Sequence, residues 1–201
     1  MPVYDKERAE ALNYWLRTER PGELEFIDRY ARFYGGPVLE LASGAARVTK
    51  ELARRGHTVV GLELSDAMLS KAREVVSKLQ SAVRSRIRLV KGDMRTFAFA
   101  RPFPLICIPF YSFWYNLDEI GADACVRSMT ENLLPGGVFL VEGERGPGER
   151  DGTAACIRDR EHHAFWTSAS ERYGFRFRYE TYNVDTGPGN GYGRFLVGTK
   201  R

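Results

Sequence analysis

Cysteine is scarce in this sequence, and long apolar runs are missing from it. Its three cysteines, Cys107, Cys125 and Cys156, are widely spaced, which fits neither a disulfide framework nor a zinc site and suits a reducing cytoplasm. No apolar run approaches the roughly 20 residues of a membrane-spanning helix. The first residues, MPVYDKERAEALNYW, are charged throughout and lack the apolar core of a signal peptide. We therefore expect a cytoplasmic protein with no membrane partner and no metal centre.

The excess of positive charge is small. The chain has 30 Lys and Arg against 26 Asp and Glu, a net charge of +4. Basic residues are denser in RSRIRLVK (84–91) and FRFRY (175–179), which a solvated face explains better than a nucleic-acid surface. A nucleic-acid partner is therefore possible but not favoured. The length of 201 residues favours one domain with a sizeable core.

Short apolar runs alternate with helical patterns from residue 38 onward. Strands are expected at 38–41, 57–64, 86–93, 105–110 and 137–143. Val48 and Leu52 share a helix face ahead of Gly56, which offers a C-terminal stop. A second helix is expected in SDAMLSKAREVVSKLQ, with Ser65 as a good N-cap. Five alternating strands and helices of this kind indicate a parallel sheet covered on both faces.

Both ends of the chain depart from this pattern. Helical segments around 6–17 and 22–34 predict an N-terminal helical cap. FRFRYETYNV (175–184) alternates with period two and leads through a Gly/Pro/Asn loop to GRFLVGTKR (193–201), which predicts an antiparallel hairpin. We expect the strand at 175–184 to run parallel to the first five. The loops at 143–158 and 185–193, together with the cap, would then lie on the ligand side of the sheet.

The first strand runs into a loop of small residues, Ala42 to Ala46, where open α/β sheets commonly bind ligands. A dinucleotide fingerprint needs a small residue at the sixth loop position, which is Arg47 here, and a Walker loop would need Gly-Lys-Ser/Thr. Glu63 follows at the end of the second strand. A carboxylate there can accept both ribose hydroxyls and would repel a 2′-phosphate, which argues against NADP.

Taken in order, these motifs resemble those of class I S-adenosylmethionine-dependent methyltransferases. The first motif of that family is an acidic residue, an apolar residue and a Gly-x-Gly-x-Gly loop. Glu40 stands at the acidic position, and Ala42, Gly44 and Ala46 stand at the three glycines. Alanine is small enough for close packing but is awkward wherever the turn needs a positive φ.

Later motifs extend the resemblance over about residues 22–142. Gly92-Asp93-Met94 is similar to the end of the third strand in the family, IPFYSF (108–113) to its fourth-strand motif, and LLPGGVFLVE (133–142) to the turn into its fifth strand. The resemblance implies an α/β, Rossmann-like, doubly wound sheet of seven strands, mostly parallel with an antiparallel C-terminal strand. It implies one domain over 1–201, with a helical cap at 1–35, a cofactor-binding core at 36–143 and a substrate-side region at 144–201.

The same resemblance implies S-adenosyl-L-methionine as cofactor and S-adenosyl-L-homocysteine as product. It places Asp93 at the adenine amino group and Leu64 and Met68 beside the adenine ring. The expected cofactor-binding residues are Glu40, Ala42, Ser43, Gly44, Arg47, Glu63, Leu64, Met68, Asp93, Met94, Pro109, Phe110 and, from the cap, Tyr14. Other interpretations stay open: Glu63 could cap a helix, Asp93 could be a turn residue, Met68 plain core, and Arg47 a solvent-side helix residue.

Methyl transfer mainly requires alignment of the reactants and exclusion of water. Tyr111 stands where many amino-methylating members carry a polar or aromatic residue beside the methyl group, so it is the expected catalytic residue, with a structural aromatic as the alternative. Glu142 and Glu144 are possible polar contacts for the acceptor. His162 or His163 could act as a base, although adjacent histidines at a helix start are more often exposed.

We expect a small-molecule N- or O-methyltransferase, because the cap and loops are short and no further recognition domain is evident. The alternative enzyme is an RNA or protein methyltransferase, which the basic balance allows. A third class is a non-catalytic cofactor-binding protein, suggested by the alanines at 42 and 46.

Overall fold

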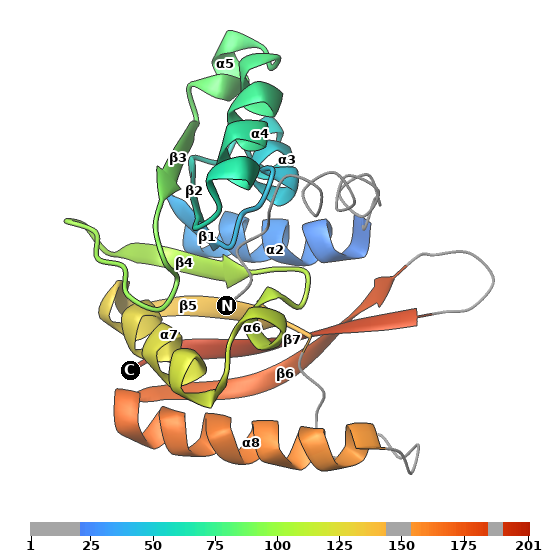
Figure 1. Ribbon diagram of the computed structural model, residues 1–201, viewed down its shortest axis with the longest axis vertical. Coiled ribbons are helices and arrows are strands. Elements are labelled where there is room, and N and C mark those ends of the chain that lie inside the picture. Colours follow the sequence, from blue (N-terminus) through green and yellow to red (C-terminus); the bar gives the residue numbers. More distant parts are fainter. Residues whose placement is uncertain (1–20, 144–153, 185–190) are drawn as a thin grey trace.

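A seven-stranded sheet in the order β3-β2-β1-β4-β5-β7-β6 runs through the molecule (Figure 1). The computed structural model describes residues 21–143, 154–184 and 191–201. Its strands are β1 Val38–Leu41, β2 Val59–Glu63, β3 Ile87–Lys91, β4 Phe103–Ile108, β5 Leu133–Glu142, β6 Phe175–Val184 and β7 Gly191–Lys200. Its helices are α2 Pro21–Tyr34, α3 Arg47–Arg54, α4 Asp66–Ser77, α5 Ser81–Arg84, α6 Ser112–Asn116, α7 Glu119–Glu131 and α8 Ala154–Tyr173.

The first five strands are parallel, as predicted. From β1 the chain adds β2 and β3 on one side and then returns to place β4 and β5 on the other. The winding therefore reverses between β1 and β4, and ligands of open α/β sheets bind beyond the carboxyl ends of the strands at such a point. The expected alternation fails once, because residues 92–102 connect β3 to β4 without a helix.

The C-terminal hairpin is the antiparallel part of the sheet. β7 pairs antiparallel with both β5 and β6, so β6 runs parallel to the first five strands and β7 opposes them. The last strand thus inserts between β5 and β6, an order that the sequence pattern alone did not indicate. Gly198 makes room for this, because a Cβ atom at that position would overlap the ring of Phe139 from β5.

Helices cover both faces of the sheet and bury both sides of its central strands (Figure 1). On one face α2 and α3 pack Phe26, Ile27, Val48 and Leu52 against Val38, Leu105, Leu140 and Phe195. On the other, α6, α7 and α8 pack Phe113, Val126, Met129 and Trp166 against Leu39, Ile106, Phe139 and Val141. Each fully buried aliphatic or aromatic side chain contributes roughly 1.5–3 kcal/mol. Because strand side chains alternate, Glu40 and Glu142 lie on the α2/α3 face with Val38 and Leu140.

Several element boundaries follow the predicted signals. The Ser65 side chain accepts a hydrogen bond from the Met68 N–H at 3.3 Å and caps α4, and Gly56, at φ +100°, follows the end of α3. Other boundaries differ from prediction: β4 starts and ends two residues early, so Pro109 and Phe110 belong to a turn. The expected helix at 6–17 and part of the loop at 185–193 lie outside the described residues. Among the described helices, none has the length and apolar composition needed to cross a membrane.

Candidate cofactor site

The loop after β1 has a left-handed backbone at three positions. The φ angle is +53° at Ala42, +55° at Gly44 and +64° at Ala46. These are the positions aligned with the family glycines, and an L-residue other than glycine is disfavoured there by roughly 1–2 kcal/mol. The loop therefore keeps the backbone shape of a Gly-x-Gly-x-Gly turn even though alanine fills two of the three places.

Glu63 fastens this loop to the end of β2. Its Oε2 accepts a hydrogen bond from the Gly44 N–H at 2.9 Å, and its Oε1 accepts one from the Ser65 N–H at 2.8 Å. A carboxylate has about four acceptor positions, so the two oxygens can still accept ribose hydroxyls. The bond to Ser65 shows that the alternative role, at the start of α4, is also present. Ribose binding by Glu63 stays a prediction.

Two apolar residues near the loop differ in their exposure. A Cβ atom added at Gly44 would lie 3.2 Å from Cε of Met68, which is buried, whereas the neighbouring Leu64 is exposed. Met68 thus supports the loop from the protein interior, and Leu64 presents its side chain beside Glu63. Both positions are compatible with an adenine contact, which remains a prediction for each.

Gly61 in β2 is a residue that the sequence interpretation missed. A Cβ atom there would meet the Ser43 Oγ at 2.9 Å and the Thr49 Oγ1 at 3.1 Å. The hydroxyl of Ser43 is buried and has no hydrogen-bond partner among the residues that the structure describes. An isolated glycine inside a strand pattern is the usual signal for such a close approach, and it was visible in HTVVGLEL.

Glu40 lies beneath the loop, where its side chain is 2% exposed and accepts a hydrogen bond from the Thr49 hydroxyl. Burial raises the pKa of Glu40 to about 7, against the lowering effects of Thr49 and Arg47. The contact with Thr49 ties β1 to α3 directly under the loop. Contact with the cofactor is a separate expectation and stays a prediction.

Arg47 is not a solvent-side residue, and that interpretation was wrong. Its side chain is 14% exposed and forms an ion pair with the fully buried Glu23 of α2 at 2.6 Å. Burial alone would lower the pKa of Arg47, but the carboxylates of Glu23, Glu40 and Glu142 hold it above its ordinary value. Its guanidinium also lies 5.5 Å from the centroid of the Phe110 ring. Arg47 therefore links α2, α3 and the turn after β4.

Asp93 and Met94 follow β3 at the same edge of the sheet. The Asp93 carboxylate accepts hydrogen bonds from the Arg95 backbone N–H at 2.8 Å and from its guanidinium Nε at 2.9 Å. These bonds hold the pKa of Asp93 below its ordinary value. The turn-residue interpretation therefore describes part of its role, and an adenine contact would have to share the carboxylate with Arg95. Met94 is buried.

The turn after β4 carries Tyr111. Pro109 is buried, and Phe110 and Tyr111 have φ angles of +60° and +57°. Tyr111 is 49% exposed, and its ring lies against the backbone of Gly143 at the end of β5. The tyrosine ring is thus held at the carboxyl ends of β4 and β5, next to the switch point of the sheet. Its catalytic role stays a prediction.

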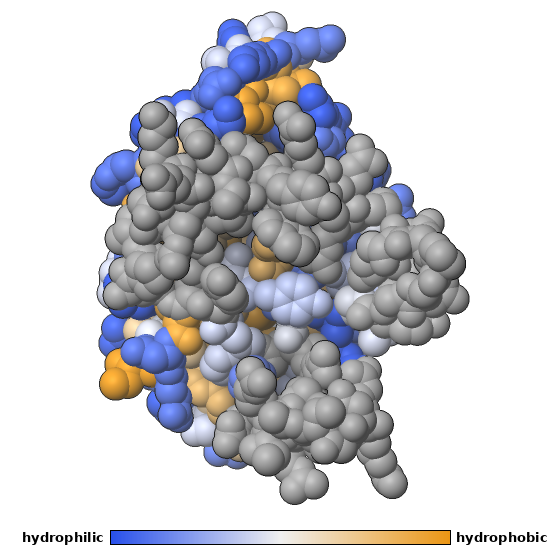
Figure 2. Space-filling model, turned by 45° about the vertical axis from the view of Figure 1, so that its right-hand side comes forward, coloured by the Kyte–Doolittle hydropathy of each residue, from blue (hydrophilic) through white to orange (hydrophobic). Residues whose placement is uncertain are grey.

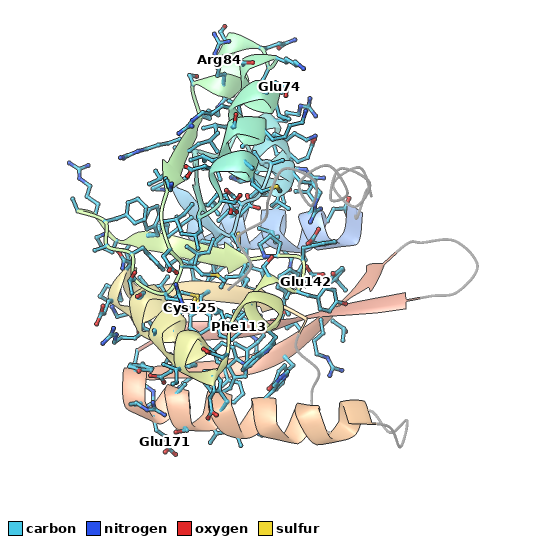
Figure 3. The ribbon with its side chains drawn as sticks, viewed as in Figure 1. Glu74, Arg84, Phe113, Cys125, Glu142 and Glu171 are labelled. Carbon is cyan, nitrogen blue, oxygen red and sulfur yellow. The ribbon has the colours of Figure 1, made fainter. Side chains whose placement is uncertain are left out.

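Glu142 is fully buried at the carboxyl end of β5, next to α6 (Figure 3). Its Oε2 accepts a hydrogen bond from the Phe110 N–H, and its Oε1 accepts one from the Tyr182 hydroxyl. The expected role as an acceptor contact is not supported by this burial, because both oxygens already bind the protein. Glu144 and Tyr14 lie outside the described residues.

Both histidines of α8 are partly buried, so the expectation that they are exposed was wrong. The His162 ring stacks on Trp114 of α6, with centroids 3.9 Å apart and planes within 3°. The His163 Nδ1 lies 3.4 Å from the Tyr179 hydroxyl. These contacts join α8 to α6 and β6 beside the turn that carries Tyr111.

Apolar and weakly polar side chains gather at the centre of the face that comes forward in Figure 2.

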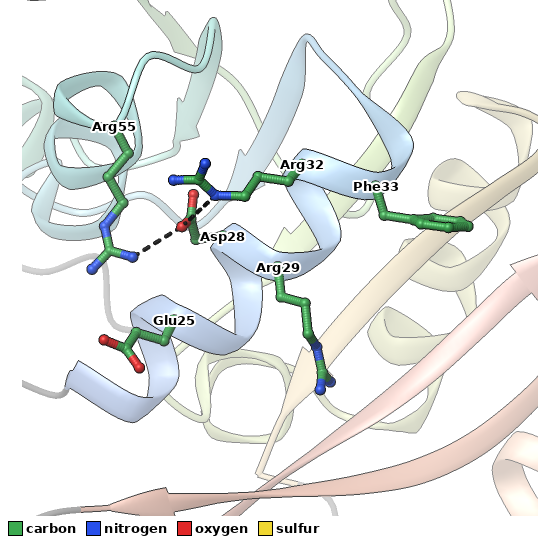
Figure 4. A pocket seen from close by; sticks show the side chains of 6 residues that line it. All are labelled: Glu25, Asp28, Arg29, Arg32, Phe33 and Arg55. Atoms are coloured by element: carbon green, nitrogen blue, oxygen red, sulfur yellow. Dashed lines mark hydrogen bonds and ion pairs between the residues drawn. The ribbon is translucent and has the colours of Figure 1, made fainter.

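A separate hollow lies on the outer side of α2 (Figure 4), lined by Glu25, Asp28, Arg29, Arg32, Phe33 and Arg55. Within it Asp28 pairs with Arg32 and Arg55, each at 3.0 Å. Burial opposes ionisation of Asp28, but hydrogen bonds from His57, Arg32 and Arg55 hold its pKa below the ordinary value. This hollow lies at the opposite end of α3 from Arg47, and its paired charges join α2 to α3.

Comparisons with known proteins agree with this geometry. A family model described as "Methyltransferase domain" matches residues 38–137. The dTDP-3-amino-3,4,6-trideoxy-alpha-D-glucopyranose N,N-dimethyltransferase of Streptomyces venezuelae is 36% identical over 107 residues, which are 52% of this chain and 41% of that protein. A dTDP-3-amino-3,6-dideoxy-alpha-D-glucopyranose N,N-dimethyltransferase of Streptomyces fradiae is 34% identical over 105 residues, 52% of this chain and 38% of that protein.

Two solved structures share the fold over the whole chain. The glycopeptide N-methyltransferase MtfA, complexed with S-adenosyl-L-methionine, has a TM-score of 0.70 at 23% identity and full coverage of both chains. CalS10, an amino pentose methyltransferase from Micromonospora echinaspora, has a TM-score of 0.68 at 20% identity, covering 100% of this chain and 99% of that one. The chain therefore belongs to the class I S-adenosylmethionine-dependent methyltransferases. It spans about two fifths of the length of the curated relatives named above.

Proposed function

We propose that this protein transfers the methyl group of S-adenosyl-L-methionine to an amino group of a small molecule, with an amino sugar as the first candidate. The observation that carries the proposal is the hydrogen bond from the Gly44 N–H to Glu63, which ties a loop with a left-handed backbone to the end of β2 at the switch point of the sheet. The curated relatives named as amino-sugar N,N-dimethyltransferases support the acceptor class.

The residues around the first loop fit the cofactor. Glu63 would accept hydrogen bonds from the ribose hydroxyls, and Leu64 would cover the adenine ring. The backbone at Gly44 would approach the methionine portion of the cofactor closely, because glycine has no side chain. Asp93 would accept a hydrogen bond from the adenine amino group in addition to the one that it accepts from Arg95. When bound, S-adenosyl-L-methionine supplies an electrophilic methyl group on a sulfonium sulfur. Transfer of this methyl group leaves a neutral thioether.

The chain itself would contribute alignment. An amine attacks as the free base, so the acceptor must enter the site deprotonated or lose its proton there. Tyr111, held against Gly143, would orient the acceptor nitrogen with its hydroxyl, and its ring face suits a cationic centre. The described cysteines, Cys107 and Cys125, are free thiols, which supports the cytoplasm as the compartment of action.

Methyl-transfer assays on amino-sugar nucleotides, amines and phenols, read by mass spectrometry, test the proposal. We expect methylated products only from acceptors with a free amino group. Tyr111→Phe should lower kcat roughly 10- to 100-fold, the scale of a misaligned reactant, and leave the Kd of S-adenosyl-L-homocysteine unchanged. Methylation of phenols alone, or equal losses of kcat and cofactor affinity, would contradict it.

A second candidate is a non-catalytic S-adenosylmethionine-binding protein, and the left-handed alanines favour it. Both Ala42 and Ala46 hold a conformation that glycine adopts more easily. Tight cofactor binding without turnover on amine, phenol and RNA acceptors would select this function over the first.

A further inference from the structure

A series of contacts leads from β6 to the turn that carries Tyr111. The Tyr182 hydroxyl of β6 donates to Glu142 Oε1 of β5, and Glu142 Oε2 accepts the N–H of Phe110 after β4. Tyr182 packs in the core on the α2/α3 face, and Glu142, at the end of β5 (Figure 3), is 0% exposed. These contacts therefore join β4, β5 and β6 at the carboxyl end of the sheet, although β7 lies between β5 and β6.

Two glycines make these contacts possible. A Cβ atom at Gly193 of β7 would overlap the ring of Tyr182, so this ring lies across the β7 backbone and its hydroxyl reaches Glu142 of β5. A Cβ atom at Gly143 would likewise overlap the ring of Tyr111. Both tyrosine rings thus occupy space that any larger residue would fill, which fixes the position of each ring against the sheet.

The turn needs this support because its backbone is strained. Phe110 and Tyr111 both have positive φ, a conformation that costs roughly 1–2 kcal/mol for such residues and persists only where the surroundings hold it. A hydrogen bond from an N–H to a buried carboxylate is among the stronger neutral-to-charged contacts. Glu142 is therefore the anchor of the turn, and Tyr182 orients Glu142.

We propose that Glu142 and Tyr182 are positioning residues for methyl transfer, which hold the Phe110–Tyr111 turn and thereby place the Tyr111 hydroxyl against the acceptor. This rests on the proposed function. Neither residue touches the reacting atoms, and their effect passes through the N–H of Phe110. A purely structural role would alter stability alone, whereas a positioning role separates turnover from cofactor affinity.

Tyr182→Phe is the informative variant, because it removes the hydroxyl and keeps the ring over Gly193. We expect faster amide hydrogen exchange in peptides covering residues 109–112, a kcat lowered roughly 10- to 100-fold, and an unchanged Kd for S-adenosyl-L-homocysteine. Glu142→Gln, which keeps an oxygen for the Phe110 N–H, should retain more of kcat than Glu142→Ala.

Tyr173→Phe is the matched control. It removes a tyrosine bond to a carboxylate, that of Asp123 at 2.6 Å, but one that links α8 to α7. It should change neither kcat nor exchange at 109–112. Unchanged exchange or unchanged kcat in folded Tyr182→Phe would overturn the proposal, as would a parallel loss of cofactor affinity. If the wild-type protein methylates no acceptor, the proposed function fails, and the exchange result still decides whether Tyr182 holds the turn.

Discussion

At the scale of single residues, a carboxyl group buried beneath the loop at residues 42–46 should make the stability of the protein depend on pH. Glu40 faces Thr49, Arg47 and Glu23, and burial raises its pKa to about 7 from an ordinary value of 4.5. In the unfolded chain the group ionises near pH 4.5, while in the fold it keeps its proton until about pH 7. The free energy of unfolding should therefore fall as the pH rises through this window, by roughly 3 kcal/mol for the full shift.

Glu40→Gln should remove that dependence. The amide keeps an oxygen for the Thr49 hydroxyl and carries no charge, so the variant should match the wild type near pH 4.5 and exceed its stability above pH 7. Urea unfolding at a series of pH values measures the difference between the two proteins. A wild-type stability that rises between pH 5 and 7 relative to the variant would show that the carboxylate is stabilised in the fold.

The left-handed alanines make a second prediction at this scale. Ala42→Gly should relieve the strained φ, raise the free energy of unfolding by up to about 1 kcal/mol, and leave S-adenosyl-L-homocysteine affinity intact or improved. Ala45→Gly, in the same loop at a position without positive φ, is the control and should cost roughly 0.5–1 kcal/mol. Thermal unfolding and ligand titration of both variants check this; a large loss of affinity in Ala42→Gly would contradict it.

At the scale of elements, the strands and helices of the parallel half were predictable because their signals are local. Three of the four residues of Val38–Leu41 are apolar because helices cover both faces of the sheet, and Ser65 caps α4 through its own side chain. The three loop positions adopt a positive φ. The burial of Arg47 was not predictable, because its partner Glu23 belongs to another helix. The insertion of β7 depends on ring packing over Gly198, which no periodicity encodes.

Gly198→Ala tests that insertion. The added methyl group would overlap the ring of Phe139, and both residues are buried, so the variant should lose roughly 3 kcal/mol or more of stability. Phe139→Leu should recover part of the loss in the double variant, since the smaller side chain makes room. Additive effects of the two substitutions in chemical unfolding would mean that the residues do not meet across β5 and β7.

At the scale of the whole molecule, the doubly wound sheet brings together groups that are far apart in the sequence. Glu63, Asp93, Tyr111 and Glu142 each follow or end a parallel strand, so they share one edge of the sheet. The motif spacing predicted this edge of the sheet and the family to which the protein belongs. The links that hold Tyr111, from Glu142 and Tyr182, depend on the order of β5, β7 and β6 and emerge only from the fold.

Calorimetric titration of the protein with S-adenosyl-L-homocysteine and with NADPH tests most directly whether this edge of the sheet binds the methyltransferase cofactor. We expect binding of S-adenosyl-L-homocysteine and no binding of NADPH. Glu63→Ala should weaken that binding by roughly 1.5–3 kcal/mol through the lost charge-assisted bonds, whereas Glu74→Ala, on the exposed side of α4, should not change it. Tight NADPH binding without S-adenosyl-L-homocysteine binding would show that this edge binds another cofactor, and full affinity in folded Glu63→Ala would show that Glu63 does not bind the ribose.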